Sequence, residues 1–123
     1  MDATNLAQLY DLPPLQWTDI LARLDRGLTQ APGTGGPDRH SSWLTTLDAD
    51  GAPHVTGVGA MWHDDSFWFE TGERTRKGRN LARDPRCALS LATQEFDLVV
   101  EGIADPSDDR ARRGDPLGFL TAQ

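Results

Sequence analysis

The chain has 123 residues, of which 37% are hydrophobic and 25% are charged, and this size supports one domain with a single core. Its formal net charge of −7 argues against a general binder of nucleic acids or anionic membranes. The sequence has no apolar run long enough to cross a membrane, and its N-terminus lacks the basic and apolar regions of a signal peptide. These features predict a cytoplasmic protein without a membrane or nucleic-acid partner.

The first third of the chain predicts one helix followed by a loop. In residues 13–28, apolar side chains recur near one face of a 3.6-residue period, two prolines stand at the start and Gly27 lies near the end. The stretch after this helix is dense in glycine and proline and lacks the Gly-Lys-Ser/Thr signature of a P-loop. Residues 1–41 are therefore expected to form an N-terminal helix and a Gly/Pro-rich loop.

From Ser42 onward the composition changes to that of a β protein. Runs of β-branched and aromatic residues, separated by turn signals, predict strands at residues 42–48, 53–62, 66–71, 86–93 and 96–104. The Asp50-Gly51 pair predicts a tight turn between the first two strands. In the third strand, Phe67 and Phe69 share one face while Trp68 and Glu70 share the other.

A change of period at residues 75–84 predicts a short helix between the third and fourth strands. The helix is expected to end at Asp84, since Pro85 disfavours helical geometry in the residue before it. Five antiparallel strands in a meander should curl into a barrel, so the predicted fold is mainly β with α, and its domain spans residues 42–104. Residues 105–123 lack periodicity and predict a loose C-terminal tail.

Half of the basic residues are concentrated around the predicted short helix. Six of the 12 Lys and Arg residues fall within residues 74–86, where Asp84 is the one acidic residue. Arg74, Arg76 and Lys77 crowd the N-terminus of the helix, where the helix dipole makes a positive charge unfavourable by about 0.3–1 kcal/mol. An anion bound at this helix N-terminus would remove that cost.

Two threonines complete a donor set for a phosphate at the same place. Thr75 is a suitable N-cap residue, and the hydroxyl of Thr71, at the end of the preceding strand, can point into the same site. The alternative is a solvated basic helix face, which charge runs usually are. A second anomaly favours the ligand: Gly57 and Gly59 interrupt a strand, where glycine often marks close approach of a ligand. A flat ring along the second and third strands, with its phosphate at the helix, would explain both features.

Residues 43–104 resemble the FMN-binding split barrel of the pyridoxamine 5′-phosphate oxidase type. The resemblance rests on the order of a D-x-x-G turn at 48–51, a strand ending in Thr71, a [ST]-R-K triplet at 75–77, an N-L pair at 80–81 and a D-P-R triplet at 84–86. It implies an antiparallel split β-barrel and a homodimer with the cofactor at the subunit interface. It also implies FMN or an 8-hydroxy-5-deazaflavin coenzyme, and less commonly haem.

The resemblance further implies roles for particular residues. The cofactor phosphate would contact Thr71, Thr75, Arg76 and Lys77. The backbone of Thr56, Gly57, Val58 and Gly59 would lie against the isoalloxazine ring, and Asp97 would face the ring edge. No catalytic acid or base is identified, and three histidines without close pairing argue against a metal site.

The chain also departs from the family. Pyridoxamine phosphate oxidases have a lysine for the substrate phosphate where this chain has Met61, and an arginine for the cofactor where it has Thr56. Oxidation of vitamin B6 is therefore not expected. The family usually continues into further barrel structure, and the different tail of this chain suggests a C-terminally truncated form.

The predicted function is hydride transfer between a bound flavin or deazaflavin and a small-molecule substrate, in which the cofactor carries the chemistry. FMN and the deazaflavin coenzyme are not distinguished, because both offer a phosphate and a tricyclic ring. A non-catalytic module that holds flavin or haem is the alternative. A nucleic-acid module using the basic helix is a third possibility, against which the net charge counts.

Overall fold

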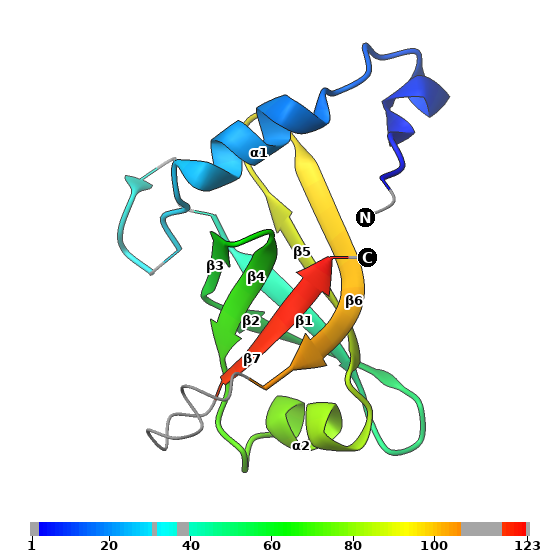
Figure 1. The fold of residues 1–123 in the computed structure, drawn as a ribbon, viewed down its shortest axis with the longest axis vertical. Coiled ribbons are helices and arrows are strands. Elements are labelled where there is room, and N and C mark those ends of the chain that lie inside the picture. The colour runs from blue at the N-terminus through cyan, green and yellow to red at the C-terminus, as the bar shows by residue number, and fades with distance from the viewer. Residues whose placement is uncertain (1–2, 31, 37–39, 107–116, 123) are drawn as a thin grey trace.

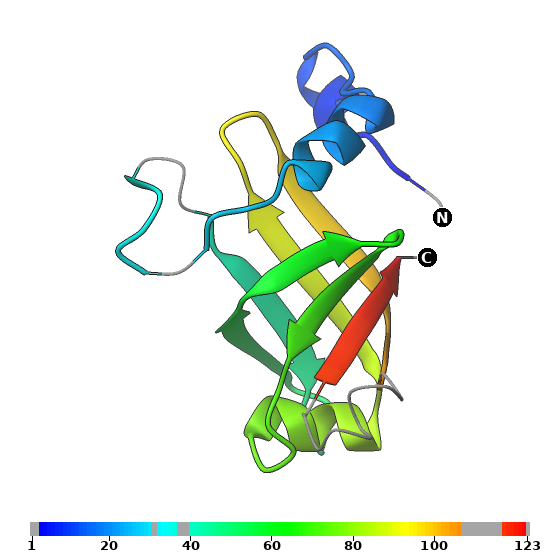
Figure 2. The ribbon, with the colours of Figure 1, turned by 60° about the vertical axis from the view of Figure 1, so that its left-hand side comes forward.

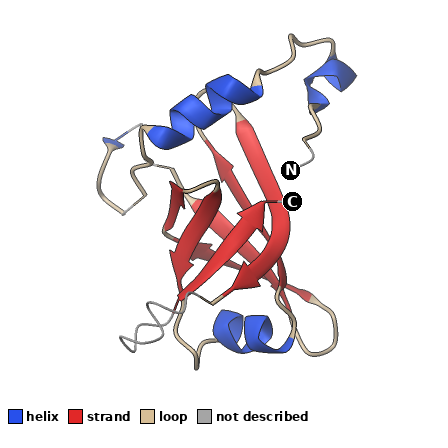
Figure 3. Cartoon of the chain, in the orientation of Figure 1, coloured by secondary structure: helices blue, strands red, loops and turns tan. Residues whose placement is uncertain are grey.

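The computed structural model describes residues 3–30, 32–36, 40–106 and 117–122. The fold is mainly β with few helices, as Figure 1 and Figure 3 show. Its elements in chain order are η1 (Leu6–Tyr10, a 3-10 helix), α1 (Trp17–Asp25), β1 (Ser42–Leu47), β2 (Pro53–Val58), β3 (Ala60–His63), β4 (Ser66–Glu70), α2 (Arg76–Arg83), β5 (Arg86–Ala92), β6 (Asp97–Asp105) and β7 (Leu117–Ala122).

The strands form one antiparallel sheet in the order β2-β1-β5-β6-β7-β4-β3. β2 and β3 are consecutive in the chain but occupy opposite edges of the sheet, so the sheet must curl until its two edges meet at Gly59 (Figure 2). Among the described strands, β2 and β3 share no ladder. The barrel is therefore split along this line, which confirms the predicted fold class.

The core lies inside the curled sheet, and α1 and α2 stand at its opposite ends (Figure 1). Phe67 and Phe69 point inward and are almost fully buried, as their alternation predicts. Leu24 of α1 is buried against this core at one end, and Leu81 of α2 packs against it at the other. The remaining buried apolar residues are Leu44, Ala60, Leu89, Leu91, Phe96, Val100 and Ala104.

Gln30 spans the split where the two sheet edges meet. Its side-chain amide donates to the Ala60 carbonyl (2.6 Å), and its oxygen accepts from the Ala60 N–H (3.0 Å) and the Ser42 hydroxyl (2.7 Å). The first residue of β3 thus receives from one side chain the hydrogen bonds that a neighbouring strand would supply. Gln30 therefore ties β3 to β1 without closing the barrel.

The prediction of one continuous strand over residues 53–62 is wrong. Residues 53–58 pair with β1, whereas residues 60–63 pair with β4. β1 has six residues, and its register with β2 ends at the Ser42–Val58 pair. Residues beyond Val58 have no partner on β1, so the chain leaves that edge at Gly59 and pairs at the opposite edge.

The prediction of a loose tail over residues 105–123 is wrong for Asp105 and for residues 117–122, which lie in strands. Asp105 ends β6, and residues 117–122 form β7 between β6 and β4. Without β7, both neighbours would be open edges with unpaired backbone groups. Among the described residues the sheet consequently has seven strands rather than a five-strand meander, and α2 lies between β4 and β5. Residues 107–116 and 123 lie outside the described residues.

The N-terminal helix is shorter than the predicted range 13–28. α1 begins at Trp17 and ends at Asp25, and Gly27 follows with φ +85°. Leu15 lies before it and is 43% exposed, so no packing holds a helical turn there, and short helices depend on such packing. The described part of the chain contains no helix with the length and apolar character that a membrane crossing needs.

Candidate functional site

The predicted helix at residues 75–84 forms α2, with Thr75 as its N-cap. The Thr75 hydroxyl accepts a hydrogen bond from the Gly78 N–H at 3.1 Å. The N–H groups of Arg76 and Lys77, the first two helical residues, have no acceptor within the helix. Two backbone donors therefore remain at a helix end that carries partial positive charge, which is the arrangement that binds a phosphate oxygen.

Thr71 and Thr75 meet at this helix end, as the sequence predicts. The Thr75 hydroxyl donates to the Gly72 carbonyl (2.6 Å), so in its 3.1 Å contact with the Thr71 hydroxyl it accepts and Thr71 donates. The Thr75 proton is thus used within the turn. Thr71 can redirect its own proton toward an anion without disturbing the helix cap.

Gly78 is a residue that the sequence analysis did not single out. A Cβ atom built on it would lie 2.1 Å from the Gly72 carbonyl oxygen and 3.1 Å from the Thr75 Oγ1 atom. The segment before α2 therefore packs directly on the backbone of the first helical turn. The sequence signal was present, since a glycine inside a predicted helix costs about 1 kcal/mol relative to alanine and needs a reason.

The cations of the junction between β4 and α2 (residues 71–84) differ in their partners. Arg76 forms a two-bond fork with the Asp48 carboxylate, from Nε to Oδ1 at 2.9 Å and from Nη2 to Oδ2 at 2.5 Å. Lys77 is half-buried and makes no side-chain hydrogen bond or ion pair with any other residue that the structure describes. Its ammonium group therefore keeps its donors for a ligand.

The arginines further along α2 and at the start of β5 also have partners within the chain. Arg79, Arg83 and Arg86 are all exposed, as solvated helix and strand-edge charges would be. Arg83 donates to the Leu47 carbonyl and, at 3.1 Å, to the Asn80 side-chain oxygen. Arg86 pairs with Asp84 at 2.7 Å. Arg79 is exposed and donates to the Arg74 carbonyl at 3.2 Å.

Two carboxylates beside these arginines should make the free energy of unfolding depend on pH in the acid range. Hydrogen bonds from Arg86 lower the pKa of the Asp84 carboxyl to about 2. Those from Arg76, with a further one from Asn80, hold the pKa of Asp48 well below its usual range. In the unfolded chain an aspartate titrates near about pH 4, so these contributions to stability are present above that pH and are lost as the pH falls toward about 2.

We therefore expect a small stability difference between the protein and its Asp84→Asn variant that is constant above about pH 5 and shrinks below about pH 4. Urea unfolding of both proteins across this range measures it. A difference that is the same at acid and neutral pH would contradict the role of the Asp84–Arg86 pair.

The residues predicted to face a ring lie along the edge strand β2 and at Gly59, the joint between β2 and β3. Thr56 is two residues from His54, which pairs with Thr46, and Thr46 accepts a hydrogen bond from Asn80 of α2 (3.0 Å). Thr56, Gly57, Val58 and Gly59 thus lead from the α2 end of the barrel toward the α1 end. A Cβ on Gly57 would contact only the Trp43 ring, at 3.5 Å, and one on Gly59 would meet open space.

Asp97, predicted to face the ring edge, lies far from the α2 end of the barrel. It begins β6 and pairs with Ala92, whereas Arg86, next to α2, pairs with Ile103. The six residue steps from Arg86 to Ala92 correspond to about 20 Å along the strand. Asp97 is exposed at the α1 end of the barrel.

In the part of the chain that the structure describes, the other reactive side chains stand apart from one another. Burial raises the pKa of the Cys87 thiol to about 11, which makes it a poor nucleophile at neutral pH. His40 is buried and contacts Arg23 at 3.0 Å, and His63 is exposed at the end of β3. No group of three or more His, Cys, Asp or Glu among the described residues could hold a metal ion.

Comparison with known proteins agrees with the fold. The chain is 37% identical over 101 residues to a pyridoxine/pyridoxamine 5′-phosphate oxidase of Anaeromyxobacter dehalogenans (strain 2CP-C), covering 80% of this chain and 51% of that protein. The chain thus spans about half the length of that relative. Among solved structures, an F420 reductase superposes with a TM-score of 0.57 at 18% identity, covering 68% of this chain and 86% of that one.

A heme binding protein from Mycobacterium smegmatis superposes with a TM-score of 0.59 at 20% identity, covering 83% of this chain and 50% of that one. The sequence profile described as pyridoxamine 5′-phosphate oxidase matches residues 36–116, well over half of the chain. That match includes the α2 junction and most of the strands around it. The chain therefore belongs to the pyridoxamine 5′-phosphate oxidase family.

Proposed function

We propose that the protein is an oxidoreductase that binds FMN or an 8-hydroxy-5-deazaflavin coenzyme and transfers a hydride to or from a small molecule. The observation that carries the proposal is the donor set at the start of α2. Two backbone N–H groups with no acceptor inside the helix, the Thr71 hydroxyl and the Lys77 ammonium, which has no side-chain partner among the described residues, all belong to one short segment of chain. This chemistry fits a phosphate better than any uncharged group.

Each predicted residue has a role in this proposal. Thr71, Arg76 and Lys77 bind the phosphate, and Thr75 fixes the helix end that presents it. Thr56, Gly57, Val58 and Gly59 support the ring with the backbone of β2 and of the joint, since β2 has one strand neighbour, β1, among the described strands. A bound flavin or deazaflavin ring supplies the hydride chemistry. Asp97 beside the ring edge stays a prediction.

The proposed substrate is not pyridoxamine phosphate, although curated relatives carry that activity in their names. The support comes from two positions on β2 and β3. Met61, 56% exposed, stands where the resemblance to the family implies a lysine for the substrate phosphate, and Thr56 where it implies an arginine for the cofactor. Neither side chain can neutralise a phosphate.

We also propose that two copies associate through the outer face of β1, β2, β5 and β6, with the cofactor between them. Trp43, Val55 and Val99 are exposed by 48%, 55% and 62%. Strand register puts them on one face, because Trp43 pairs with Gly57 and Ser90, and Ser90 pairs with Val99. Exposed apolar groups gathered in this way are typical of an interface.

The compartment of action is proposed to be the cytoplasm.

The alternative is a module that holds flavin or haem without turnover, which the likeness to a heme binding protein keeps open. Absorbance and mass of the small molecule released from purified protein distinguish FMN, deazaflavin and haem. Bleaching of a bound flavin by a reductant, with recovery in the presence of an acceptor, is the expected result for an oxidoreductase. A colourless protein that takes up neither FMN nor deazaflavin would refute the proposal.

A further inference from the structure

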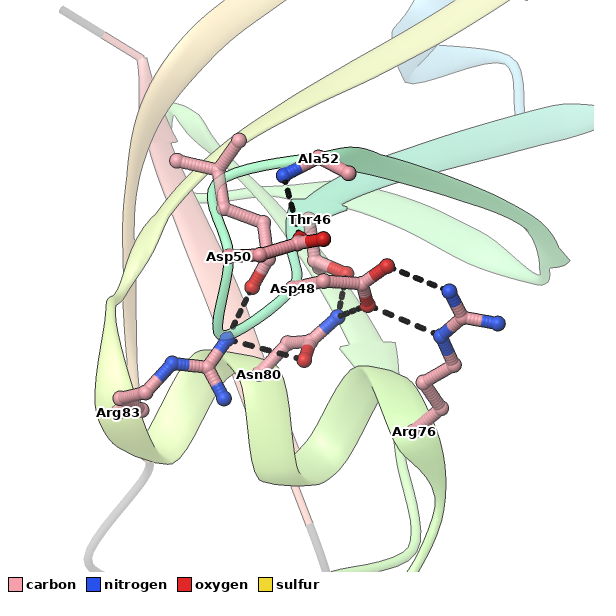
Figure 4. Close-up of polar contacts among 8 residues, drawn as sticks. Thr46, Asp48, Asp50, Ala52, Arg76, Asn80 and Arg83 are labelled. Carbon is pink, nitrogen blue, oxygen red and sulfur yellow. Dashed lines mark hydrogen bonds and ion pairs between the residues drawn. The ribbon is translucent and has the colours of Figure 1, made fainter.

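Asp48 lies immediately after β1 and faces the first turn of α2, as Figure 4 shows. Its two carboxylate oxygens each accept a hydrogen bond from Arg76, at 2.9 and 2.5 Å. Arg76, which the sequence predicts to bind the phosphate, is thus already held by a carboxylate.

 The orientation of the Arg76 side chain is therefore set before any ligand binds.

Asp48 is itself held by a hydrogen bond from the buried side-chain amide of Asn80. Asn80 is 4% exposed, and its amide nitrogen donates to Asp48 Oδ1 and to the Thr46 hydroxyl, both at 3.0 Å. Arg83 donates to the Asn80 oxygen, which fixes the orientation of the amide (Figure 4). The backbone of Asp48 is also tied, through its N–H to the Ala52 carbonyl at 2.9 Å. The carboxylate consequently has little freedom to move.

The fork leaves part of Arg76 available. A guanidinium group has five N–H donors, and Asp48 uses one from Nε and one from Nη2. In Figure 4 the remaining terminal nitrogen points away from Asp48. Arg76 can therefore keep its bond to Asp48 and donate to an anion at the same time.

The fork contributes little to stability, which leaves its geometry to be explained. The Arg76 side chain is 57% exposed, and exposed ion pairs contribute little to stability because water screens them. The buried Asn80 bonds already attach the turn after β1 to α2. A second attachment through an exposed arginine adds little to that contact, whereas it does fix where the guanidinium lies.

We infer that Asp48 is a positioning residue for phosphate binding: it holds Arg76 so that the free edge of the guanidinium is presented at the start of α2. The inference rests on the proposed function, because it assumes a ligand phosphate at this helix end. It assigns the D-x-x-G turn a part in ligand binding beyond reversing the chain.

The sign of one substitution separates this role from simple electrostatics. Asp48→Asn removes a negative charge near the phosphate, which by charge alone would tighten binding. If Asp48 acts by orienting Arg76, the variant instead binds FMN about 3- to 10-fold more weakly, within the usual range for coupled neighbours. Riboflavin, which has the same ring and no phosphate, should bind both proteins equally.

The test is a double-mutant cycle read by flavin fluorescence. FMN and riboflavin are titrated into the wild type, Asp48→Asn, Arg76→Ala and the double variant, with Asp84→Asn as the control that removes the other carboxylate paired with an arginine near α2. We expect Asp48→Asn to lower FMN affinity in the wild type and to have no effect once Arg76 is absent. Asp84→Asn should bind FMN as the wild type does.

The outcomes distinguish the inference from the proposed function. Equal losses of FMN and riboflavin affinity in Asp48→Asn, a tighter FMN complex, or a loss that persists without Arg76 would each overturn the positioning role alone. A wild type that binds FMN no more tightly than riboflavin would overturn the proposed function and the inference with it. Thermal unfolding of each variant identifies any loss that comes from misfolding.

Discussion

Gly78→Ala is expected to lower the free energy of unfolding by about 1–3 kcal/mol, the usual cost of forcing an extra methyl group into a packed site. The new Cβ atom would lie 2.1 Å from the Gly72 carbonyl oxygen, and that oxygen belongs to the backbone rather than to a flexible side chain. Either the first turn of α2 or the segment before it must move. The change opposes the gain of about 1 kcal/mol that alanine normally brings to a helix interior.

Denaturant unfolding of the wild type and Gly78→Ala measures this effect, and Gly59→Ala is the matched control. A Cβ atom on Gly59 meets nothing within 4 Å, and its φ is not in the left-handed region. Gly59→Ala should therefore change stability by less than about 1 kcal/mol. If Gly78→Ala proves as stable as the wild type, the close approach of Gly72 to α2 is not a feature of the folded protein.

Lys77→Ala is expected to weaken FMN binding by about 1.5–3 kcal/mol, which corresponds to roughly 10- to 150-fold in affinity. The reason is the loss of a charge-assisted hydrogen bond to the phosphate. Lys77 is the cleanest residue for this test, because its side chain has no hydrogen bond or ion pair with any described residue that the substitution would break. A substitution of Arg76, by contrast, would also break its two-bond fork with Asp48.

Arg79→Ala serves as the control for Lys77→Ala. It removes the same charge from the same helix, and the exposed Arg79 side chain, unlike Lys77, already donates a hydrogen bond within the chain, to the Arg74 carbonyl. Titration of both variants with FMN should show a loss for Lys77→Ala and a change of less than about threefold for Arg79→Ala, as expected for a screened surface charge. Equal losses would mean that the helix attracts FMN by its overall charge and not through a specific lysine.

The local chemistry of the junction could be predicted from the sequence because it depends on neighbours in the chain. Thr75 as N-cap, the helix after it and the stop at Asp84 all follow from rules that act within a few residues. The contact of Thr71 with Thr75 also spans a short separation. The roles of these residues in phosphate binding stay predictions.

The contacts that depend on sheet pairing could not be predicted in the same way. Asp48 meets Arg76 only because β1 and α2 are brought together by the fold, and Arg83 reaches Leu47 for the same reason. The division of residues 53–62 into β2 and β3 depends on the length of β1, which is a property of the partner strand. β7 was missed because its pairing with β4 and β6 outweighs weak local signals.

The most direct test of the account compares the affinity of the wild-type protein for FMN with its affinity for riboflavin under one salt condition. The two ligands share the ring and differ in the phosphate, so the ratio isolates the contribution of the residues at the start of α2. We expect FMN to bind at least about 10-fold more tightly, as hydrogen bonds from charged groups to the phosphate imply. Equal affinities would contradict a phosphate site at this junction.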